Sequence, residues 1–186
     1  MSSFRIHSVD TAPEGSREML RQIRESLGRI PNLAAAMAES PTLLRGFFTL
    51  REIFAQGTFT PGEIQVLSLA NAFENDCAWC MGFHTFMALA EGVPAEAVAA
   101  LRDGDMPSDV RLAALSELSR SVIRNRGKAG ADELRAFYDA GYTPAQALEV
   151  VVGVAFSTMA NYAGHFADVP LEEPFSTHTW KRTVSA

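Results

Sequence analysis

Apolar residues recur every three or four positions along most of this chain, and no segment alternates between apolar and polar residues as a half-buried strand does. In the first such segment Met19, Ile23 and Leu27 are spaced by four residues, and Gly28 follows as a helix stop. The pattern predicts an all-α fold. We expect helices over about residues 13–27, 41–56, 60–74, 77–91, 95–102, 107–126, 131–140 and 143–165.

Two of the expected helices begin with the same capping pattern, a threonine followed by proline and then, at the third helical position, glutamate or glutamine. The first is Thr60-Pro61-Gly62-Glu63 and the second, 83 positions later, is Thr143-Pro144-Ala145-Gln146. At the same offset the two cysteines of the chain align with Ala160 and Ala163. One interpretation is a duplicated helical hairpin in which only the first copy keeps its thiols, and the other is a chance similarity between two capped helices.

The length of 186 residues is enough for one buried core. We therefore expect a single all-α domain over residues 1–186, with its core at about 15–168 and an extended C-terminal tail at 169–186. Trp180 lies in that tail, and we expect it to be exposed and to pack on a neighbouring copy of the chain in a homo-oligomer.

The net charge limits the classes of partner. The formal charge is −6 and the isoelectric point is about 5.2, so no nucleic-acid partner is expected. The start has no apolar run of signal-peptide length, and no window offers about 18 uninterrupted apolar residues, so no membrane span is expected. A cytoplasmic location follows, and there a cysteine pair is more often catalytic or metal-binding than structural.

The candidate chemistry lies in one short stretch, which holds the only two cysteines, Cys77 and Cys80, and also His84. On a helix these three residues stand at i, i+3 and i+7 and therefore share one face. Side chains three residues apart are close enough for their sulfurs to meet, so the pair can cycle between dithiol and disulfide with little backbone movement. The spacing predicts a redox site with a titratable base.

A free thiol with a pKa near 8.5 is only about 3% thiolate at pH 7, so the attacking sulfur needs local activation. Cys77 stands where a helix N-terminus would stabilise an anion, whereas Cys80 has His84 one turn along as a base. Spacing alone does not decide which sulfur attacks first, and the base favours Cys80. Glu74 is either a solvated helix end or an acid–base group.

Two further interpretations of the pair stay open. It can be a buried and inert pair of thiols. Alternatively Cys77, Cys80 and His84 are good zinc ligands, with His165 or a water molecule as the fourth ligand, in a non-catalytic structural oligomer.

The run Cys77-Ala78-Trp79-Cys80-Met81-Gly82-Phe83-His84-Thr85 resembles the Cys-x-x-Cys-x-x-x-His-Thr signature of the carboxymuconolactone decarboxylase / AhpD-like alkylhydroperoxidase family. The resemblance extends to Ile30-Pro31-Asn32-Leu33, to Ser40-Pro41 and to Asn161-Tyr162-Ala163-Gly164-His165, and covers about residues 15–175. It implies an AhpD-like helical fold that assembles into trimers or hexamers.

The resemblance also implies an oxidoreductase that acts on peroxide and uses neither a cofactor nor a metal. Cys80 would attack an organic hydroperoxide, activated by His84, and Cys77 would then condense with it to give the Cys77–Cys80 disulfide. A thioredoxin-like or lipoyl protein, or a small thiol, would reduce that disulfide. Lactone decarboxylases of the same family lack the cysteine pair, so a lyase that uses a histidine and acidic residues is the alternative enzyme.

The chain departs from the family pattern at one position. Peroxidases of the family carry a glutamate about twelve residues before the first cysteine, and Gln65 stands there in this sequence. Glutamine forms hydrogen bonds but does not accept a proton. Either Gln65 only orients other groups, or a candidate relay residue, Glu74 or His165, transfers the proton.

Overall fold

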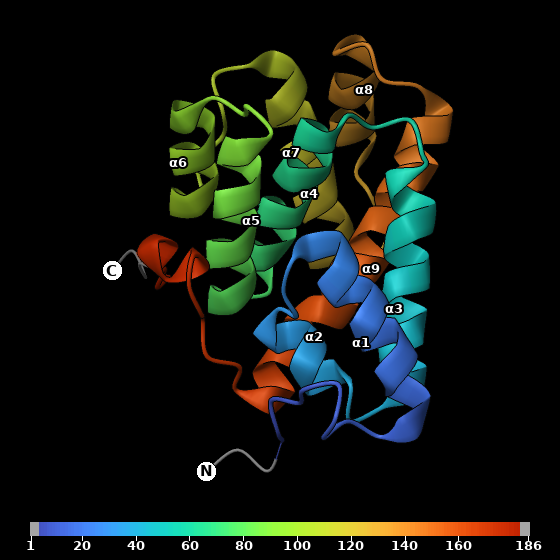
Figure 1. Ribbon diagram of the computed structural model, residues 1–186. Coiled ribbons are helices and arrows are strands. Elements are labelled where there is room, and N and C mark those ends of the chain that lie inside the picture. The colour runs from blue at the N-terminus through green and yellow to red at the C-terminus, as the bar shows by residue number, and fades with distance from the viewer. Residues whose placement is uncertain (1–3, 183–186) are drawn as a thin grey trace.

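The computed structural model describes residues 4–182, and all regular structure within this range is helical, as the apolar spacing predicts. Figure 1 shows the helices in order along the chain. They are α1 (Glu14–Leu27), α2 (Asn32–Met37), α3 (Pro41–Ala55), α4 (Pro61–Glu74), α5 (Ala78–Ala90), α6 (Ala95–Asp103), α7 (Val110–Arg124), α8 (Ala131–Asp139), α9 (Pro144–Ala167) and the short 3-10 helix η1 (Phe175–His178).

Both predicted capping boxes are present. The Thr60 hydroxyl accepts the N–H of Glu63, and the Glu63 carboxylate accepts the N–H of Thr60. Thr143 and Gln146 make the reciprocal pair at the start of α9. Because each box satisfies two N–H groups that a helix leaves unpaired, it fixes where the helix begins and which residues face inward.

The core is organised around α4, which packs against α5, α7 and α9, while α9 also packs against α3. Figure 1 shows α4 in the middle of the molecule, with the other helices around it. Val66, Leu67 and Leu69 of α4 are fully buried, although they point in different directions around the helix axis. A helix that is apolar on nearly all sides must be surrounded in this way.

Among the described residues, α9 alone is long and apolar enough to cross a membrane, by length and composition. Its packing against α3, α4 and α7 gives its apolar character another explanation, since the core helix of a folded domain has the same composition.

The two capped segments do not fold alike, and the second one, Pro144–Ala167, does not repeat the hairpin of the first. The first segment breaks at Asn75 and Asp76, where Asp76 adopts a left-handed conformation with a φ of 54°, and α5 starts after Cys77. The second segment continues through Thr158 and Met159 as one uninterrupted helix, α9. Asn and Asp tolerate the left-handed turn that ends a helix, whereas threonine and methionine do not favour it.

The expectation of an exposed Trp180 is wrong. Its ring packs 6.0 Å from the ring of Phe73, and its Nε1–H donates to the backbone oxygen of Arg102 at 2.8 Å. Phe175 is buried against Phe83, with ring centroids 4.9 Å apart. The C-terminal segment therefore packs on α5 of its own chain, as Figure 1 shows beside the lower part of that helix.

This close packing requires the glycine at position 82 of α5. A Cβ atom there would lie 2.5 Å from Cδ2 of Leu171 and 3.2 Å from the backbone oxygen of His178. The C-terminal segment thus holds the outer face of the helix that carries the cysteine pair.

Candidate active site

The turn between α4 and α5 places the first cysteine at a helix N-terminus. The N–H of Cys77 donates to the backbone oxygen of Ala72 at 2.9 Å, and Cys77 is the N-cap residue of α5. The N–H of Cys80 donates to the sulfur of Cys77 at 3.3 Å. The two cysteines form a disulfide, with their Cα atoms 5.3 Å apart. The helix N-terminus therefore acts on Cys77, which agrees with the argument from spacing.

The two sulfurs have different surroundings, although Cys77 and Cys80 are only 1% and 0% exposed. Cys80 lines a pocket, whereas Cys77 is not among the lining residues. The sulfur of Cys77 lies against α9 instead, where a Cβ atom at Gly164 would be 3.4 Å from it. Only Cys80 therefore faces a space that a substrate can occupy.

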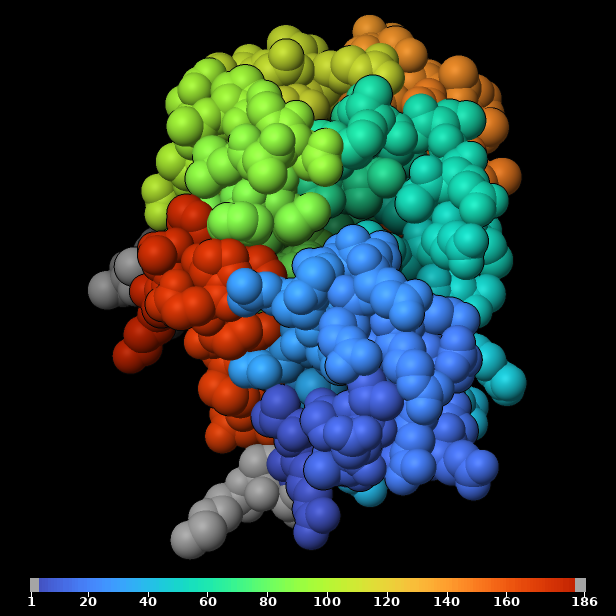
Figure 2. Space-filling model, viewed as in Figure 1, coloured from blue at the N-terminus to red at the C-terminus, as the bar shows by residue number. Residues whose placement is uncertain are grey.

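The pocket has a volume of about 240 Å³ and lies between α3, α4, α5, α9 and the connection from α1 to α2. Figure 2 shows the surface hollowed where the blue end of α1, the teal α3–α4 region and the green α5 meet. Its aromatic lining consists of Phe47, Phe48, Phe54, Phe59, Trp79, Phe83 and Phe156. The polar side chains in the wall are Arg51, Gln65, His84 and Glu91. An apolar cavity of about 150 Å³ accommodates benzene, so this pocket has room for one substituted ring or a short branched chain.

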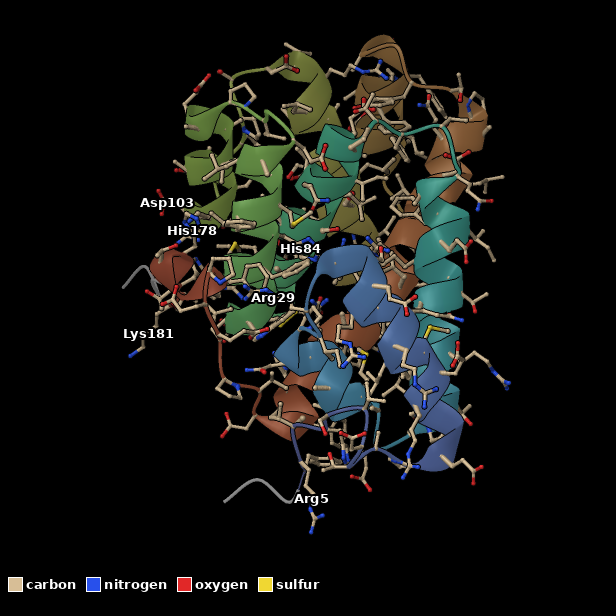
Figure 3. All side chains as sticks on the ribbon, in the orientation of Figure 1. Arg5, Arg29, His84, Asp103, His178 and Lys181 are labelled. Carbon is tan, nitrogen blue, oxygen red and sulfur yellow. A yellow bond between two sulfur atoms is a disulfide. The ribbon has the colours of Figure 1, made fainter. Side chains whose placement is uncertain are left out.

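His84 and Gln65 are joined across the α4–α5 hairpin. The Nδ1–H of His84 donates to Oε1 of Gln65 at 2.8 Å. This bond fixes the tautomer in which Nε2 carries the lone pair, and Nε2 has no hydrogen-bonding partner among residues 4–182. Figure 3 shows His84 near the middle of the molecule, close to α4 and α5. Gln65 is thus bonded to the imidazole, which is the contact that the first of its two predicted alternatives requires.

Burial lowers the pKa of His84 to about 3, and the positive charge of Arg51 lowers it further in the same direction. His84 is therefore a neutral imidazole at physiological pH. A neutral imidazole can take up the proton of the Cys80 thiol, because the thiolate formed next to it would then stabilise the imidazolium. In the disulfide state no such negative charge is present, so the ring stays unprotonated.

The two candidate relay residues, Glu74 and His165, do not line the pocket. The Glu74 carboxylate accepts a hydrogen bond from Nη2 of Arg124 at 2.7 Å and lies 3.9 Å from Nε of Arg120, so it is paired with α7. Nε2 of His165 lies 3.3 Å from the backbone oxygen of Asp76, which it contacts at the hairpin turn. Both side chains support the turn that carries the cysteines, and neither is brought to His84.

Within residues 4–182, no group of three or more histidine, cysteine, aspartate or glutamate side chains is arranged to hold a metal ion. The zinc interpretation requires Cys77 and Cys80 as separate thiolates, whereas in this structure the two sulfurs are bonded to each other.

The tertiary structure adds residues to the site that sequence reasoning missed. The ring of Trp79 stacks on Phe83 at 5.1 Å, and its Nε1–H donates to Glu172 of the C-terminal segment at 2.9 Å. Arg51 enters the pocket wall from α3. A sequence signal existed for Arg51, since it stands at helical spacing from Phe47 and Phe54 in a mostly apolar stripe.

Comparison with known proteins supports the resemblance found in the motif. Residues 41–115 match the model of the carboxymuconolactone decarboxylase family, and this range contains both cysteines and His84. Among curated proteins, none matches the chain.

Several solved structures share the fold. The AhpD-core, peroxidase-related protein of Ralstonia eutropha JMP134 superposes with a TM-score of 0.81 at 18% identity, covering 94% of each chain. A peroxidase-related protein of Silicibacter sp. TM1040 gives 0.77 at 15% identity, covering 94% of this chain and 93% of its own. A cysteine-to-alanine variant of the debrominase Bmp8, in complex with 2,3,4-tribromopyrrole, gives 0.77 at 14% identity over 96% and 97% of the two chains. The predicted AhpD-like all-α fold is thereby confirmed.

Proposed function

We propose that the protein is a thiol-dependent peroxidase that reduces organic hydroperoxides, since residues 41–115 match the model of the carboxymuconolactone decarboxylase family and the fold is AhpD-like. One observation carries the proposal. Cys80 faces an apolar pocket together with the His84–Gln65 pair. Cys77 lies outside the pocket lining, at the N-terminus of α5.

In the first step His84 takes the proton of the Cys80 thiol through Nε2. The thiolate attacks the terminal oxygen of the hydroperoxide, and the O–O bond breaks. The alkoxide leaves and takes up a proton to become the alcohol, while Cys80 is oxidised by two electrons to the sulfenic acid. Gln65 keeps the imidazole in the required tautomer through its 2.8 Å hydrogen bond to Nδ1.

In the second step the Cys77 thiolate attacks the sulfur of the Cys80 sulfenic acid. A disulfide forms, and hydroxide leaves and is protonated to water. The N–H of Cys80, which donates to the Cys77 sulfur at 3.3 Å, and the N-terminus of α5 stabilise that thiolate. The net reaction converts one hydroperoxide and two thiols into one alcohol, one water and the disulfide that the structure contains.

The reductant that restores the dithiol has to reach a buried sulfur. Both cysteines are almost inaccessible, and only Cys80 lines the pocket. A small thiol or the slender arm of a lipoyl protein fits this access better than the broad face of a thioredoxin-like protein. Attack on the sulfur of Cys80 would release Cys77 as the stabilised thiolate leaving group.

Mass spectrometry of the thiols tests the proposal. The reduced protein, treated with one equivalent of cumene hydroperoxide, should form the Cys77–Cys80 disulfide and release cumyl alcohol. Cys80→Ser should abolish both products. Cys77→Ser should still release one alcohol per chain and stop at a Cys80 sulfenic acid that dimedone traps. If the wild-type thiols survive one equivalent of peroxide, the proposal is wrong.

A second reaction of the same dithiol is reductive dehalogenation, which the small aromatic-lined pocket and the fold of the debrominase Bmp8 favour. Two thiols would become the disulfide while a carbon–bromine bond is replaced by carbon–hydrogen, with release of bromide and one proton. Incubation of the reduced protein with 2,3,4-tribromopyrrole should then release one bromide for each disulfide formed. If no bromide is released, the dehalogenation proposal is wrong, and the peroxidase proposal is not affected.

A decarboxylase-like lyase is the alternative from another reaction class within the family. It would use His84 with an acidic group, and Glu91 is the carboxylate in the pocket wall. Lactone decarboxylation that survives replacement of both cysteines by serine would favour the lyase over both redox reactions.

We also propose that the chain forms a homo-oligomer. Trp180 no longer supports this, because it packs within its own chain. The outward face of α9 does support it, since four large apolar side chains there are 52–79% exposed: Leu148, Val151, Tyr162 and Phe166. Light scattering coupled to size exclusion should give a multiple of 20.2 kDa, and a monomer would contradict the proposal.

A further inference from the structure

A positive charge lies in the pocket wall, and no side chain within residues 4–182 forms an ion pair with it. Five residues of α3 line the pocket at helical spacing, and Arg51 is the only polar one among them; the others are Phe47, Phe48, Phe54 and Ala55. Arg51 is exposed to solvent while it lines the pocket, so its guanidinium can be reached by an anion that enters from outside.

Among the described residues, Arg51 has no polar partner. It makes no hydrogen bond or ion pair with any residue in the range 4–182. The other charged side chain in the wall, Glu91, stands at the C-terminal end of α5 and forms no ion pair with it. Neighbouring side chains partly desolvate the exposed guanidinium and so lower the pKa of Arg51, but the group stays charged, and its charge acts on His84.

The other residues that line the pocket indicate the size and the apolar character of a ligand that would fit it. Seven aromatic side chains enclose about 240 Å³, which is larger than the roughly 150 Å³ that suffices for benzene. The two uncharged polar side chains, His84 and Gln65, bond to each other and mark the reacting end near Cys80. The pocket thus combines a reacting end, an apolar wall and one cation that has no ion-pair partner in the described part of the chain.

We propose that the pocket selects a small aromatic compound that carries an acidic group, with its anion bound by Arg51 and its ring lying among the phenyl side chains next to Cys80. The proposal rests on the proposed function, because it names the substrate class of the same dithiol. A guanidinium fork suits a carboxylate, which it can bind through two parallel N–H bonds.

Binding to the oxidised protein tests the proposal without any turnover. Benzoate and benzamide have nearly the same shape and differ in charge. Calorimetry, supported by the fluorescence of Trp79 in the pocket wall, should show benzoate binding about tenfold more tightly than benzamide at low salt. The preference should shrink as salt screens the charge. Equal affinities, or no binding of either compound up to its solubility, would overturn the proposal.

Variants on the same helix identify the cation. Arg51→Gln should remove the preference for benzoate, and Arg51→Lys should keep part of it because the charge remains. Arg45→Gln is the matched control, since Arg45 is an exposed arginine of α3 outside the pocket wall. A preference that survives Arg51→Gln in a protein with a normal melting curve would also overturn the proposal.

The outcome is independent of the peroxidase test. If the protein forms the disulfide with cumene hydroperoxide but binds benzoate and benzamide equally, the proposed function stands and the proposed substrate class is wrong. If the protein prefers benzoate through Arg51 but its thiols do not react with peroxide, the proposed anion site stands and the peroxidase proposal is wrong.

Discussion

The α4–α5 hairpin and helix α9 start with the same kind of capping box but differ in the residues of the candidate site and in the turn that positions them. At the offset of 83 positions, Gln65, Cys77, Cys80 and His84 correspond to Leu148, Ala160, Ala163 and Ala167. The hairpin also contains a break, which gives the first cysteine a helix N-terminus, whereas α9 runs on without one. The capping box therefore determines only where a helix starts. The candidate site depends on the turn between α4 and α5 and on the four side chains that α9 lacks.

The largest effect is expected from replacing His84 by alanine, the residue that α9 has at the corresponding position. His84→Ala should slow disulfide formation with cumene hydroperoxide by about 100-fold, since a positioned general base contributes about 10²–10⁴. Stopped-flow measurement of the change in tryptophan fluorescence gives the rate. His165→Ala is the control and should react like the wild type, because His165 lies outside the pocket wall. An equal loss in both variants would instead favour His165 as a relay.

Removing the break is the next largest change. Replacing Asn75 and Asp76 by the threonine and methionine of α9 should cost about 2 kcal/mol of stability, because methionine disfavours the φ of 54° and the 2.8 Å bond from Asn75 to Asn161 is lost. In the reduced protein Cys77 should react more slowly with iodoacetamide as its helix N-terminus is disturbed, because less thiolate is stabilised. Urea unfolding and iodoacetamide rates measure the two effects. Asp76→Gly, which adopts positive φ freely, should keep both values near those of the wild type.

The neutral imidazole gives the hairpin a pH dependence that α9 lacks. The pKa of His84 is about 3 in the folded protein and about 6.5 in an unfolded chain. Between these values the unfolded chain binds a proton that the folded chain does not. Folding stability should therefore fall as the pH drops from 6.5 toward 3, by up to about 1.4 kcal/mol per pH unit from this group. Urea unfolding at pH 7, 6, 5 and 4 should show a shallower slope for His84→Ala. The same slope in both proteins would assign the effect to other groups.

The two caps allow the smallest and most selective test. Thr60→Ala and Thr143→Ala should each lower stability by about 1 kcal/mol, because each removes one N-cap. Only Thr60→Ala should also slow the reaction with peroxide, since the first turns of α4 position Gln65 against His84. Melting temperature and reaction rate measure the two effects. Equal rates in both variants would mean that packing, rather than the cap, positions Gln65.

Sequence reasoning found the elements that depend on local chemistry. The helix ends were predictable because threonine, proline and glycine act on their own neighbours, and the all-α fold follows from apolar spacing. Cys77 and Cys80 could be assigned to one face because three residues are nearly one turn. The position of Gln65 was identified, but its partner was not, since the two residues stand 19 positions apart across a turn whose geometry only the fold sets.

Sequence by itself thus determined which residues could do the chemistry, because residue type and helical spacing are local properties. The tertiary structure decided which of them do meet. Packing of α9 against Cys77 leaves Cys80 as the sulfur in the pocket, the ion pair of Glu74 with α7 turns that carboxylate away, and α3 brings Arg51 to the same pocket. Those contacts join residues far apart in the chain, so they depend on how the helices pack rather than on any short stretch of sequence.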